Sequence, residues 1–431
     1  MKPAALSIVD LREVIRQLPD NGLAPSREAA LGHFHEHGLP TLRDEDWKYT
    51  DLSPLVDISN RWLASGAQPD PSGVTDSAIS KITESIDATW LVIANGMVDE
   101  RRLKTVDGFG IEVSRFSDAP SPLVLDHPLA DLNAALLRDG LRIRVTGQLK
   151  KPIGILVFDH AGTAIGVTQS CVEIDFGSEA AAEVIEYHVS DGNEDHYANS
   201  VMALNIGDNA AVKHVRIQHR STRHVQTGRT SIALGKNAGL SMAGYDLGGR
   251  LIRNDIDIDL AAPGANVEFD GLYLAGDGQH IDNHTRVDHR VGPATSSQEY
   301  RGILNGACRC VWNGKAIVHK GADGTDASQA NHNLLLSDKA EIDAKPELEI
   351  YADDVKCSHG TTVGQLDEKA LFYLRTRGLD KRHATQVLTH AFAAGLVQRA
   401  PVEIVRETVT GIVQERLSQL IEADFDAELL S

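Results

Sequence analysis

A turn that contains glycine returns at nearly constant intervals through the middle of the chain. The five turns read GSEA, GDNA, GKNA, PGAN and GPAT, with glycines at positions 177, 207, 235, 264 and 292. The intervals are 30, 28, 29 and 28 residues, and the segments between the turns alternate apolar and polar residues. A strand-built repeat of this length is typical of a solenoid, whose repeats bury their apolar faces against one another. We predict a mainly β chain with a parallel β-helix core; a sandwich of stacked sheets is the less favoured alternative.

The first 85 residues have a helical pattern instead. Apolar residues recur at helical spacing at positions 8, 11, 14, 15 and 18. The segment SREAALGHFHEHG predicts a helix with Ser26 as N-cap and Gly38 as its end. Residues 69–73, PDPSG, have the composition of a linker. Within the strand region, HPLADLNAALLRDG predicts one helix that ends near Gly140 and plugs or flanks the first coil.

Helical patterns return after residue 366. Asp367 is the expected N-cap of a helix that ends at Gly378, and the next helix has an apolar stripe at positions 384, 387, 388, 391 and 392. The last helix has a stripe at positions 405, 409, 412, 417 and 420, which is more often core than partner surface. We therefore predict three domains: a helical domain over 1–85, a β-helix core over 86–365 and a helical domain over 366–431.

Charge and composition exclude several classes of partner. The chain has 42 Lys and Arg against 61 Asp and Glu, a formal charge of -19 that would repel nucleic acid and anionic lipid. Asp10, Arg12 and Glu13 interrupt the place of a secretory signal, and no later segment approaches 18 apolar residues. Four cysteines are too few for a disulfide framework in a chain of this size. We expect a cytoplasmic protein.

Motifs of nucleotide and acyl chemistry are missing. The nearest approach to a phosphate loop, GRTSIALGKN, separates Gly228 from Gly235 by six residues and has Asn237 where Ser or Thr would bind magnesium. The sequence has no GxGxxG that follows a strand and opens a helix, and no GxSxG. We therefore do not expect an enzyme.

The segment IYADDVKCSHGTTVGQ, residues 350–365, contains the main candidate site. On a strand, Cys357 and His359 project from one face, with Lys356 and Ser358 on the other. Thiolate and imidazole suit a borderline or soft metal, or a nucleophile with its base. The alternative is a small buried cysteine beside a hydrogen-bonded histidine, because two ligands cannot close a metal site.

Other polar clusters are weaker candidates. Asp255, Asp257 and Asp259 share a strand face and could bind calcium, although a solvent-facing strand has the same pattern. Two histidine-containing groups favour polar networks over metal sites: His214, His219 and His224, and then His280, Asp282, His284, Asp288 and His289. Cys308 and Cys310 could be a metal half-site or a redox pair, but core packing is favoured.

Three stretches resemble the Suf iron-sulfur cluster assembly scaffolds, the SufB/SufD family. They are DEDWKYTDL at 44–52, RGILNGACRCVWNGKAIV at 301–318 and NLLLSDKAEIDAKPELEIYADDVKCSHGTTVGQLDEKALFYLRTRGL at 333–379. Weaker similarity covers essentially the whole chain, and the third stretch is closer to the SufD branch than to the SufB branch. The resemblance implies a right-handed parallel β-helix between two helical domains.

The resemblance also implies partners and a role. Family members of this type are non-catalytic subunits that pair with the paralogue SufB at the end of the β-helix and dock the ATPase SufC on the C-terminal helices. Cys357 and His359 match the family's CSHG positions at the SufB interface, where a transient iron-sulfur cluster or iron would be shared. The histidine is the stronger candidate ligand. A reduced flavin in the complex is a further expectation, whereas this chain would bind no ATP.

We therefore expect a scaffold subunit for iron-sulfur cluster assembly that contributes to the cluster-building interface and to iron acquisition. One alternative is a calcium-dependent β-helix enzyme that acts on polysaccharide through Asp255, Asp257 and Asp259. Another is a structural adaptor without a metal role. Without its partners, the chain could also form a homodimer through its exposed strand edges.

Overall fold

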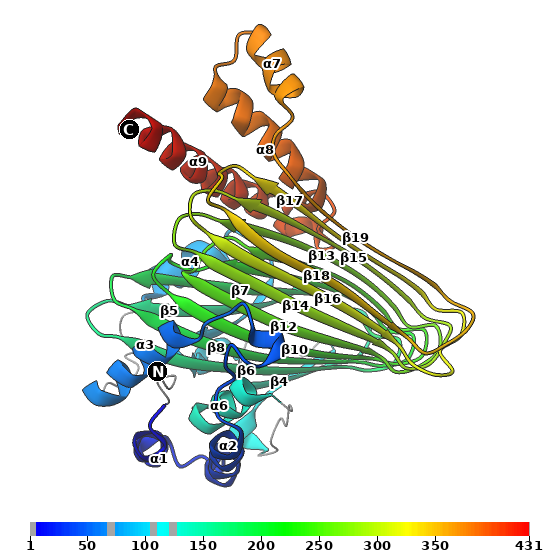
Figure 1. The fold of residues 1–431 in the computed structure, drawn as a ribbon. Coiled ribbons are helices and arrows are strands. Elements are labelled where there is room, and N and C mark those ends of the chain that lie inside the picture. The colour runs from blue at the N-terminus through cyan, green and yellow to red at the C-terminus, as the bar shows by residue number, and fades with distance from the viewer. Residues whose placement is uncertain (1–5, 67–73, 104–109, 120–126, 431) are drawn as a thin grey trace.

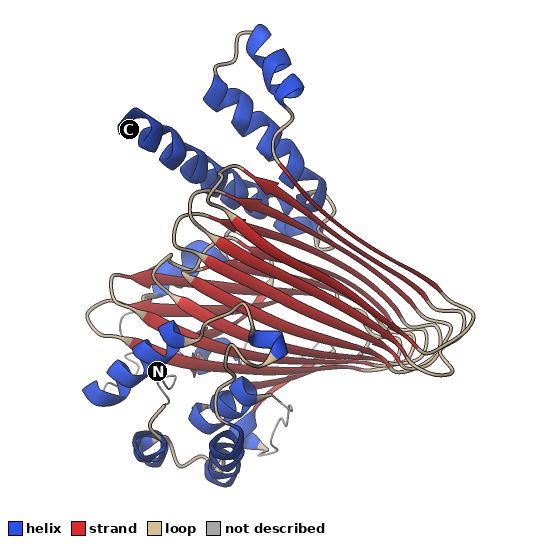
Figure 2. Cartoon of the chain, viewed as in Figure 1, coloured by secondary structure: helices blue, strands red, loops and turns tan. Residues whose placement is uncertain are grey.

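The computed structural model describes residues 6–66, 74–103, 110–119 and 127–430. Its centre is a solenoid in which successive strands alternate between two long sheets (Figures 1 and 2). From edge to edge, the ten-stranded sheet contains β19 (Lys356–Gly364), β17 (Asp326–Leu335), β15 (Thr295–Leu304), β13 (Asn266–Ala275), β11 (Gly239–Asp246), β9 (Ala211–His219), β7 (Ala181–Gly192), β5 (Ile153–Ala161), β1 (Thr89–Ala94) and β2 (Met97–Val98).

The nine-stranded sheet faces the viewer in Figure 1. It contains β18 (Glu341–Ile350), β16 (Arg309–Val318), β14 (His280–His289), β12 (Leu251–Leu260), β10 (Val225–Leu234), β8 (His196–Ile206), β6 (Gly166–Phe176), β4 (Leu141–Val145) and β3 (Ile111–Arg115). Neighbouring strands are parallel except for β2 and β3, which pair antiparallel at the N-terminal end of the solenoid. The predicted mainly β fold with a solenoid core and terminal helices is confirmed.

The sequence period equals one coil of the solenoid. Val172 of β6 lies opposite Met202 of β8, which lies opposite Thr230 of β10, so stacked residues are 30 and then 28 positions apart. These are the intervals between the first three glycine turns. Each coil therefore places its side chains directly on those of the coil before it.

The repeated turns stack through alanine and asparagine as well as glycine. In GDNA and GKNA the left-handed residue is the third position, where Asn209 has φ +58° and Asn237 has φ +55°, whereas in PGAN it is Gly264, with φ +79°. The next residue of each turn is a buried alanine: Ala180, Ala210, Ala238 and Ala265. Gly207 is required for another reason, because a Cβ there would lie 2.8 Å from the carbonyl oxygen of Phe176 in the turn below.

The interior of the solenoid has an apolar half and a polar half. Beside the stacked turns, the inward side chains belong to one large cluster of Val, Ile, Leu, Ala and Met. Farther along the same strands they become polar and remain buried, as at Glu186 and His188 of β7 and Arg216 of β9. These groups pair inside the solenoid: Arg216 donates to the Asp246 carboxylate at 2.9 and 3.2 Å.

Most N-terminal helices cover the first coils of the nine-stranded sheet, whereas the helices at Asp76–Thr83 and Glu100–Leu103 contact the ten-stranded sheet. The elements are α1 (Ile8–Gln17), α2 (Ala24–His37), η1 (Glu45–Trp47), α3 (Ser53–Ser65), α4 (Asp76–Thr83), α5 (Glu100–Leu103), η3 (Phe116–Asp118) and α6 (Pro128–Leu136). Their core includes Leu55 and Trp62 and packs on the outward side chains Val167, Tyr197 and Val225 of the sheet. The helix at α6 flanks these coils as predicted, although it ends at Leu136, before Gly140.

One helix start was predicted wrongly. We expected Ser26 to be the N-cap, but α2 begins at Ala24 with Leu23 in the cap position and no side-chain cap. Pro25 lies in the first turn, where its fixed φ and missing N–H are tolerated. The proline therefore begins this helix, and Gly38 follows its last residue as predicted.

The C-terminal helices lie at the opposite end of the solenoid (Figure 1). They are α7 (Glu368–Thr376), α8 (Lys381–Val397), η4 (Glu403–Val405) and α9 (Arg406–Leu430). The predicted stripe of the last helix packs on the outer face of the ten-stranded sheet, where Val405, Val409 and Leu417 are fully buried against residues such as Tyr245. Asp367 caps α7 by accepting a hydrogen bond from the Lys369 amide, as predicted.

The stripe predicted for α8 is only partly buried. Its buried residues are Ala384, Thr389, Ala393, Leu396 and Val397, whereas Val387 is 47 % exposed and Ala391 is exposed. The reason is that α8 contacts β13, β15 and α9 near its C-terminal end, while its beginning projects from the solenoid with α7 (Figure 1). The expected linker at 69–73 lies outside the described residues, and the three domain boundaries stay a prediction. Within the described ranges, no helix is long and apolar enough to cross a membrane.

Candidate functional site

Cys357 and His359 lie on the last strand of the solenoid. In β19, Cys357 is opposite Ala327 and His359 is opposite Gln329 of β17. Ala327 and Gln329 are buried and belong to the inward-facing positions of their strand. Because side chains alternate along a strand, Cys357 and His359 share this face, as predicted, about 6.6 Å apart along the backbone. Both therefore lie at the open mouth of the solenoid interior.

The two side chains differ in availability. The Cys357 thiol is partly buried, and burial, followed by the nearby Asp326 carboxylate, raises its pKa, so the thiol keeps its proton at neutral pH. The His359 side chain is exposed, and among the described residues no hydrogen bond or ion pair engages its ring. A neutral imidazole with a free nitrogen is a ready metal ligand, whereas the thiol must first lose its proton.

These two residues do not form a metal site by themselves. No group of three or more His, Cys, Asp or Glu side chains suited to a metal is present in the part of the chain that the structure describes. A metal held here would need further ligands from another molecule. The sequence predicted the pair and its common face, and its role in binding metal stays a prediction.

The mouth of the solenoid is bordered by two open strand edges. Both β18 and β19 pair on one side only, because they are the last strands of their sheets. The Lys356 amide bonds to Thr325 of the coil below, so the alternating N–H groups of Cys357, His359, Thr361 and Val363 face the open edge. On β18 the corresponding edge position 346 is a proline, which has no N–H to satisfy. Unpaired edges of this length are templates for another strand.

A second exposed surface lies on the projecting hairpin of α7 and α8. Phe372 is 68 % exposed, Tyr373 is 58 % exposed and Val387 is also largely uncovered. Only residues 365–367 separate β19 from α7, so this surface is joined directly to the strand that carries His359. The family resemblance assigned these helices to partner docking, but the exposure of these side chains, including Val387 of the predicted stripe, depends on how far the hairpin projects.

The aspartates considered for calcium are each paired with an arginine. The Arg253 guanidinium donates to Asp255 at 2.6 Å, Arg229 pairs with Asp257, and Arg290 donates to Asp259 at 2.9 Å. Asp255 is buried beneath the N-terminal segment, so this face of β12 is not a solvent face at that position. Carboxylates that are neutralised in this way are poor calcium ligands.

The first histidine group has buried polar contacts, but among the described residues only His224 makes hydrogen bonds. Glu186 lies 2.6 Å from His188 Nε2 and 3.2 Å from His214 Nε2 inside the solenoid. His224 Nδ1 lies 2.6 Å from the Ser190 hydroxyl, and His219 lies near Arg416 of α9. A polar network describes His214 and His224, whereas the His219 side chain has no hydrogen bond or ion pair among the described residues.

In the second cluster the side chains at 280, 282, 284 and 288 lie on the outside of the nine-stranded sheet, whereas His289 faces the solenoid interior. His280 lies 2.8 Å from the Thr50 hydroxyl, and Asp282 bonds to Thr50 and Arg253 and lies 3.2 Å from His284. Farther along β14, Asp288 pairs with Arg286 and His319, and His289 bonds to Ser296.

Cys308 and Cys310 are both buried free thiols in the apolar interior cluster. A hydrogen bond between them lowers the pKa of Cys308, whereas burial raises that of Cys310. They pack against Trp312 and Ile281 in this cluster. This is the core packing that the sequence favoured. The two cysteines lie toward the C-terminal end of β19, away from Cys357.

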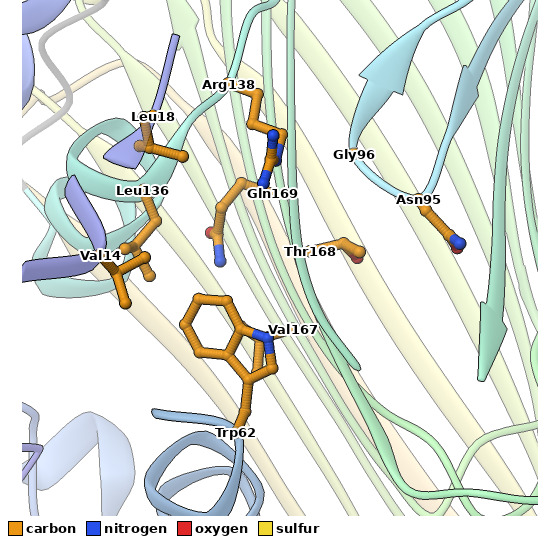
Figure 3. A pocket seen from close by; sticks show the side chains of 10 residues that line it. All are labelled: Val14, Leu18, Trp62, Asn95, Gly96, Leu136, Arg138, Val167, Thr168 and Gln169. Carbon is orange, nitrogen blue, oxygen red and sulfur yellow. The ribbon is translucent and has the colours of Figure 1, made fainter. Parts of the chain in front are cut away.

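A small cavity lies at the other end of the molecule, between the N-terminal helices and the first coils (Figure 3). Its volume of about 20 Å³ gives room for one ordered water. Gln169 points into it above the Trp62 ring, and neither the Gln169 amide nor the Trp62 indole N–H has a partner in the described structure. The cavity is remote from His359 and is too small to be a binding cleft for anything larger than a water molecule.

Comparison with known proteins defines the family. The model described as "SUF system FeS cluster assembly, SufBD core domain" matches residues 159–392, which is more than half of the chain. The chain belongs to the SufBD family. The SufBD match runs from β5 into α8 and includes β19 with Cys357 and His359.

Curated relatives agree with the SufBD match. The chain is 29 % identical to the iron-sulfur cluster assembly protein SufD of Escherichia coli over 91 % of this chain and 93 % of the relative. It is 28 % identical to an iron-sulfur cluster assembly SufBD family protein of Synechocystis over 89 % and 88 % of the two chains. It is also 28 % identical to SufD of Bacillus subtilis over 68 % and 67 %. The resemblance seen in the sequence is confirmed, and with it a role in iron-sulfur cluster assembly.

Proposed function

We propose that the chain is a non-catalytic scaffold subunit whose open solenoid end pairs with the paralogue SufB and whose projecting helices bind the ATPase SufC. The observation that carries this proposal is the open end itself: two parallel sheets stop at unpaired strands, and His359 lies at the mouth between them. A second solenoid could extend both sheets and supply the metal ligands that this chain lacks.

The contact between the open solenoid end and SufB is here called the joint. The metal species held there would be iron or a nascent iron-sulfur cluster. His359 would be the ligand from this chain, because its ring is exposed and not engaged within the described structure. Cys357, whose pKa is raised by burial, would contribute after deprotonation by metal binding. Ligands from SufB would complete the coordination.

The hairpin of α7 and α8 would be the ATPase site. Its apolar side chains Phe372, Tyr373 and Val387 are exposed on elements that project from the solenoid. Exposed aromatic residues of this kind are enriched at protein interfaces. Because α7 follows β19 after three residues, a movement of the docked ATPase would be transmitted to the strand that carries His359.

The test of the joint removes one edge hydrogen bond. Thr361→Pro deletes an N–H that faces the open edge of β19 but leaves the backbone bonds to β17, and Thr361→Ala is the matched control, which also loses the hydroxyl bond to Asn331 but keeps the N–H. After co-expression with SufB and SufC, the proline variant should lose most of the co-purified SufB, and the alanine variant should retain it. Full SufB recovery with Thr361→Pro would contradict pairing through this edge.

A further inference from the structure

Residues 44–52, here called the strap, cross the outer face of the nine-stranded sheet. The strap includes η1 and connects α2 to α3. It contacts β12, β14, β16 and β18, four successive strands of one sheet. It therefore reaches from the region under the N-terminal helices to the last strand of the solenoid.

The strap is anchored at a buried charged cluster. The Arg253 guanidinium carbon lies 4.1 Å from the centroid of the Trp47 ring, and Arg253 Nη1 donates to the Asp46 carbonyl at 2.9 Å. The Thr50 hydroxyl donates to Asp282, which also accepts from Arg253. Arg253, Asp282 and Thr50 are fully buried. Buried charges that lose a partner are costly, so this end of the strap is held firmly.

From this anchor, the strap extends over the last two strands of the sheet. The guanidinium carbon of Arg309 on β16 lies 5.5 Å from the Tyr49 ring centroid. Lys345 Nζ of β18 donates to Glu45 Oε1 at 2.9 Å. These contacts are exposed and weaker than the anchor. They give the edge strand β18 a support from a segment about 300 residues earlier in the chain.

The other edge strand has no such support. Among the described residues, no hydrogen bond, ion pair or cation–π contact joins the strap to β19, which pairs with β17 and continues after residues 365–367 into the projecting α7. The two strands at the mouth are thus attached to opposite parts of the chain. β18 is supported by the N-terminal segment, and β19 is joined to the C-terminal hairpin.

We propose that the strap is a brace that positions β18, so that motion of the hairpin displaces β19 alone. At the joint, β18 would then be the fixed edge on which a partner aligns, and β19 would be the movable edge that carries His359. The role of the two edges in partner pairing rests on the proposed function, whereas the support of β18 by the strap is a property of the isolated chain. Trp47, Thr50 and Glu45 are the strap residues that position β18.

The test is hydrogen exchange by mass spectrometry on the isolated full chain. In Trp47→Ala, amides of 341–350 should exchange about tenfold faster, since the desolvated cation–π contact and the anchor are lost. Amides of 356–364 should change less than about twofold. Arg61→Ala, which breaks an ion pair of α3 with Asp195 but leaves the strap, should change neither segment.

A milder variant covers the case in which Trp47→Ala does not fold. Glu45→Gln removes only the exposed ion pair to Lys345 and should raise exchange in 341–350 about two- to fivefold. Unchanged exchange in 341–350, or equal increases in both segments, would overturn the brace. Because no partner is present, this result is independent of whether SufB binds at the edges, and the two proposals can fail separately.

Discussion

Most charged side chains discussed above form ion pairs or hydrogen bonds with neighbouring side chains. Arg220 Nη1 donates to Asp159 at 2.6 Å, and both side chains are completely buried. The same holds for Arg216 with Asp246. Paired charges of this kind stabilise a particular arrangement of the interior and leave no free ligand set. His359 differs because its ring is engaged by none of the described residues, and this contrast makes it the best candidate for chemistry.

Three buried histidines should make the fold less stable in mild acid. Burial lowers the pKa of His196 to about 3 and the pKa values of His224 and His289 to about 4. The unfolded chain protonates these residues below about pH 6.5, whereas the folded chain does so only near their lowered values. The unfolded state then binds more protons, so the free energy of unfolding falls as the pH drops from about 6.5 toward 4.

The check is the melting temperature between about pH 7.5 and pH 4.5. It should be nearly level above pH 6.5 and fall steadily below it. A melting temperature that stays constant or rises toward pH 5 would contradict the buried, neutral state of these rings.

For single residues, the sequence predicted the face of a strand on which a side chain lies better than it predicted what surrounds that side chain. The alternation of side chains placed Cys357 and His359 on one face, because that depends only on the strand period. The sequence could not show that Asp255 is covered, since His127, whose Nε2 lies 3.6 Å from the Asp255 carboxylate, is well over 100 positions away. Contacts between distant segments decide which carboxylate is free, and no local pattern contains them.

The stacked turns determine how one coil sits on the next. Gly207→Ala should destabilise the protein by about 1–3 kcal/mol, because the new Cβ would overlap backbone atoms of the turn below, which cannot move aside. Gly239→Ala is the matched control, since a Cβ there meets nothing within 4 Å. Urea unfolding should separate the two variants. Equal midpoints would show that the turn tolerates a side chain.

The two faces of the C-terminal helices should respond differently to substitution. Phe372→Ser changes an exposed side chain and should shift the unfolding free energy by less than about 0.5 kcal/mol while weakening SufC capture. Leu417→Ala opens a cavity against the ten-stranded sheet and should cost about 2–5 kcal/mol. Unfolding midpoints and co-purification measure both effects. Normal SufC capture by Phe372→Ser would remove this side chain from the docking surface.

Helices and the solenoid repeat were predicted correctly where residues close together in the sequence determine them. The solenoid period, the Asp367 cap and the stripe of the last helix depend on spacing or on a neighbouring residue, and all three are present. The start of α2 was wrong because Pro25 overrides Ser26. The buried face of α8 was only partly right, because Val387 and Ala391 lie where the helix projects away from the sheet, and this depends on tertiary placement.

As a whole, the molecule is a solenoid with one covered end and one open end. The N-terminal helices and antiparallel strands β2 and β3 lie at the first coils, whereas β18 and β19 end without a partner. Helices project beside the open end and are joined to the strand with His359. This arrangement suits the proposed subunit, which would bring an ATPase and a second solenoid to one place.

The most direct test of this account is the iron and acid-labile sulfide content of the complex, purified without oxygen after co-expression with SufB and SufC. His359→Ala should lose most of both while the three proteins still co-purify. His35→Ala, which removes an exposed imidazole on α2 far from the open end, should retain the native content. Native iron and sulfide in His359→Ala would contradict a metal role for this subunit and leave the chemistry to its partners.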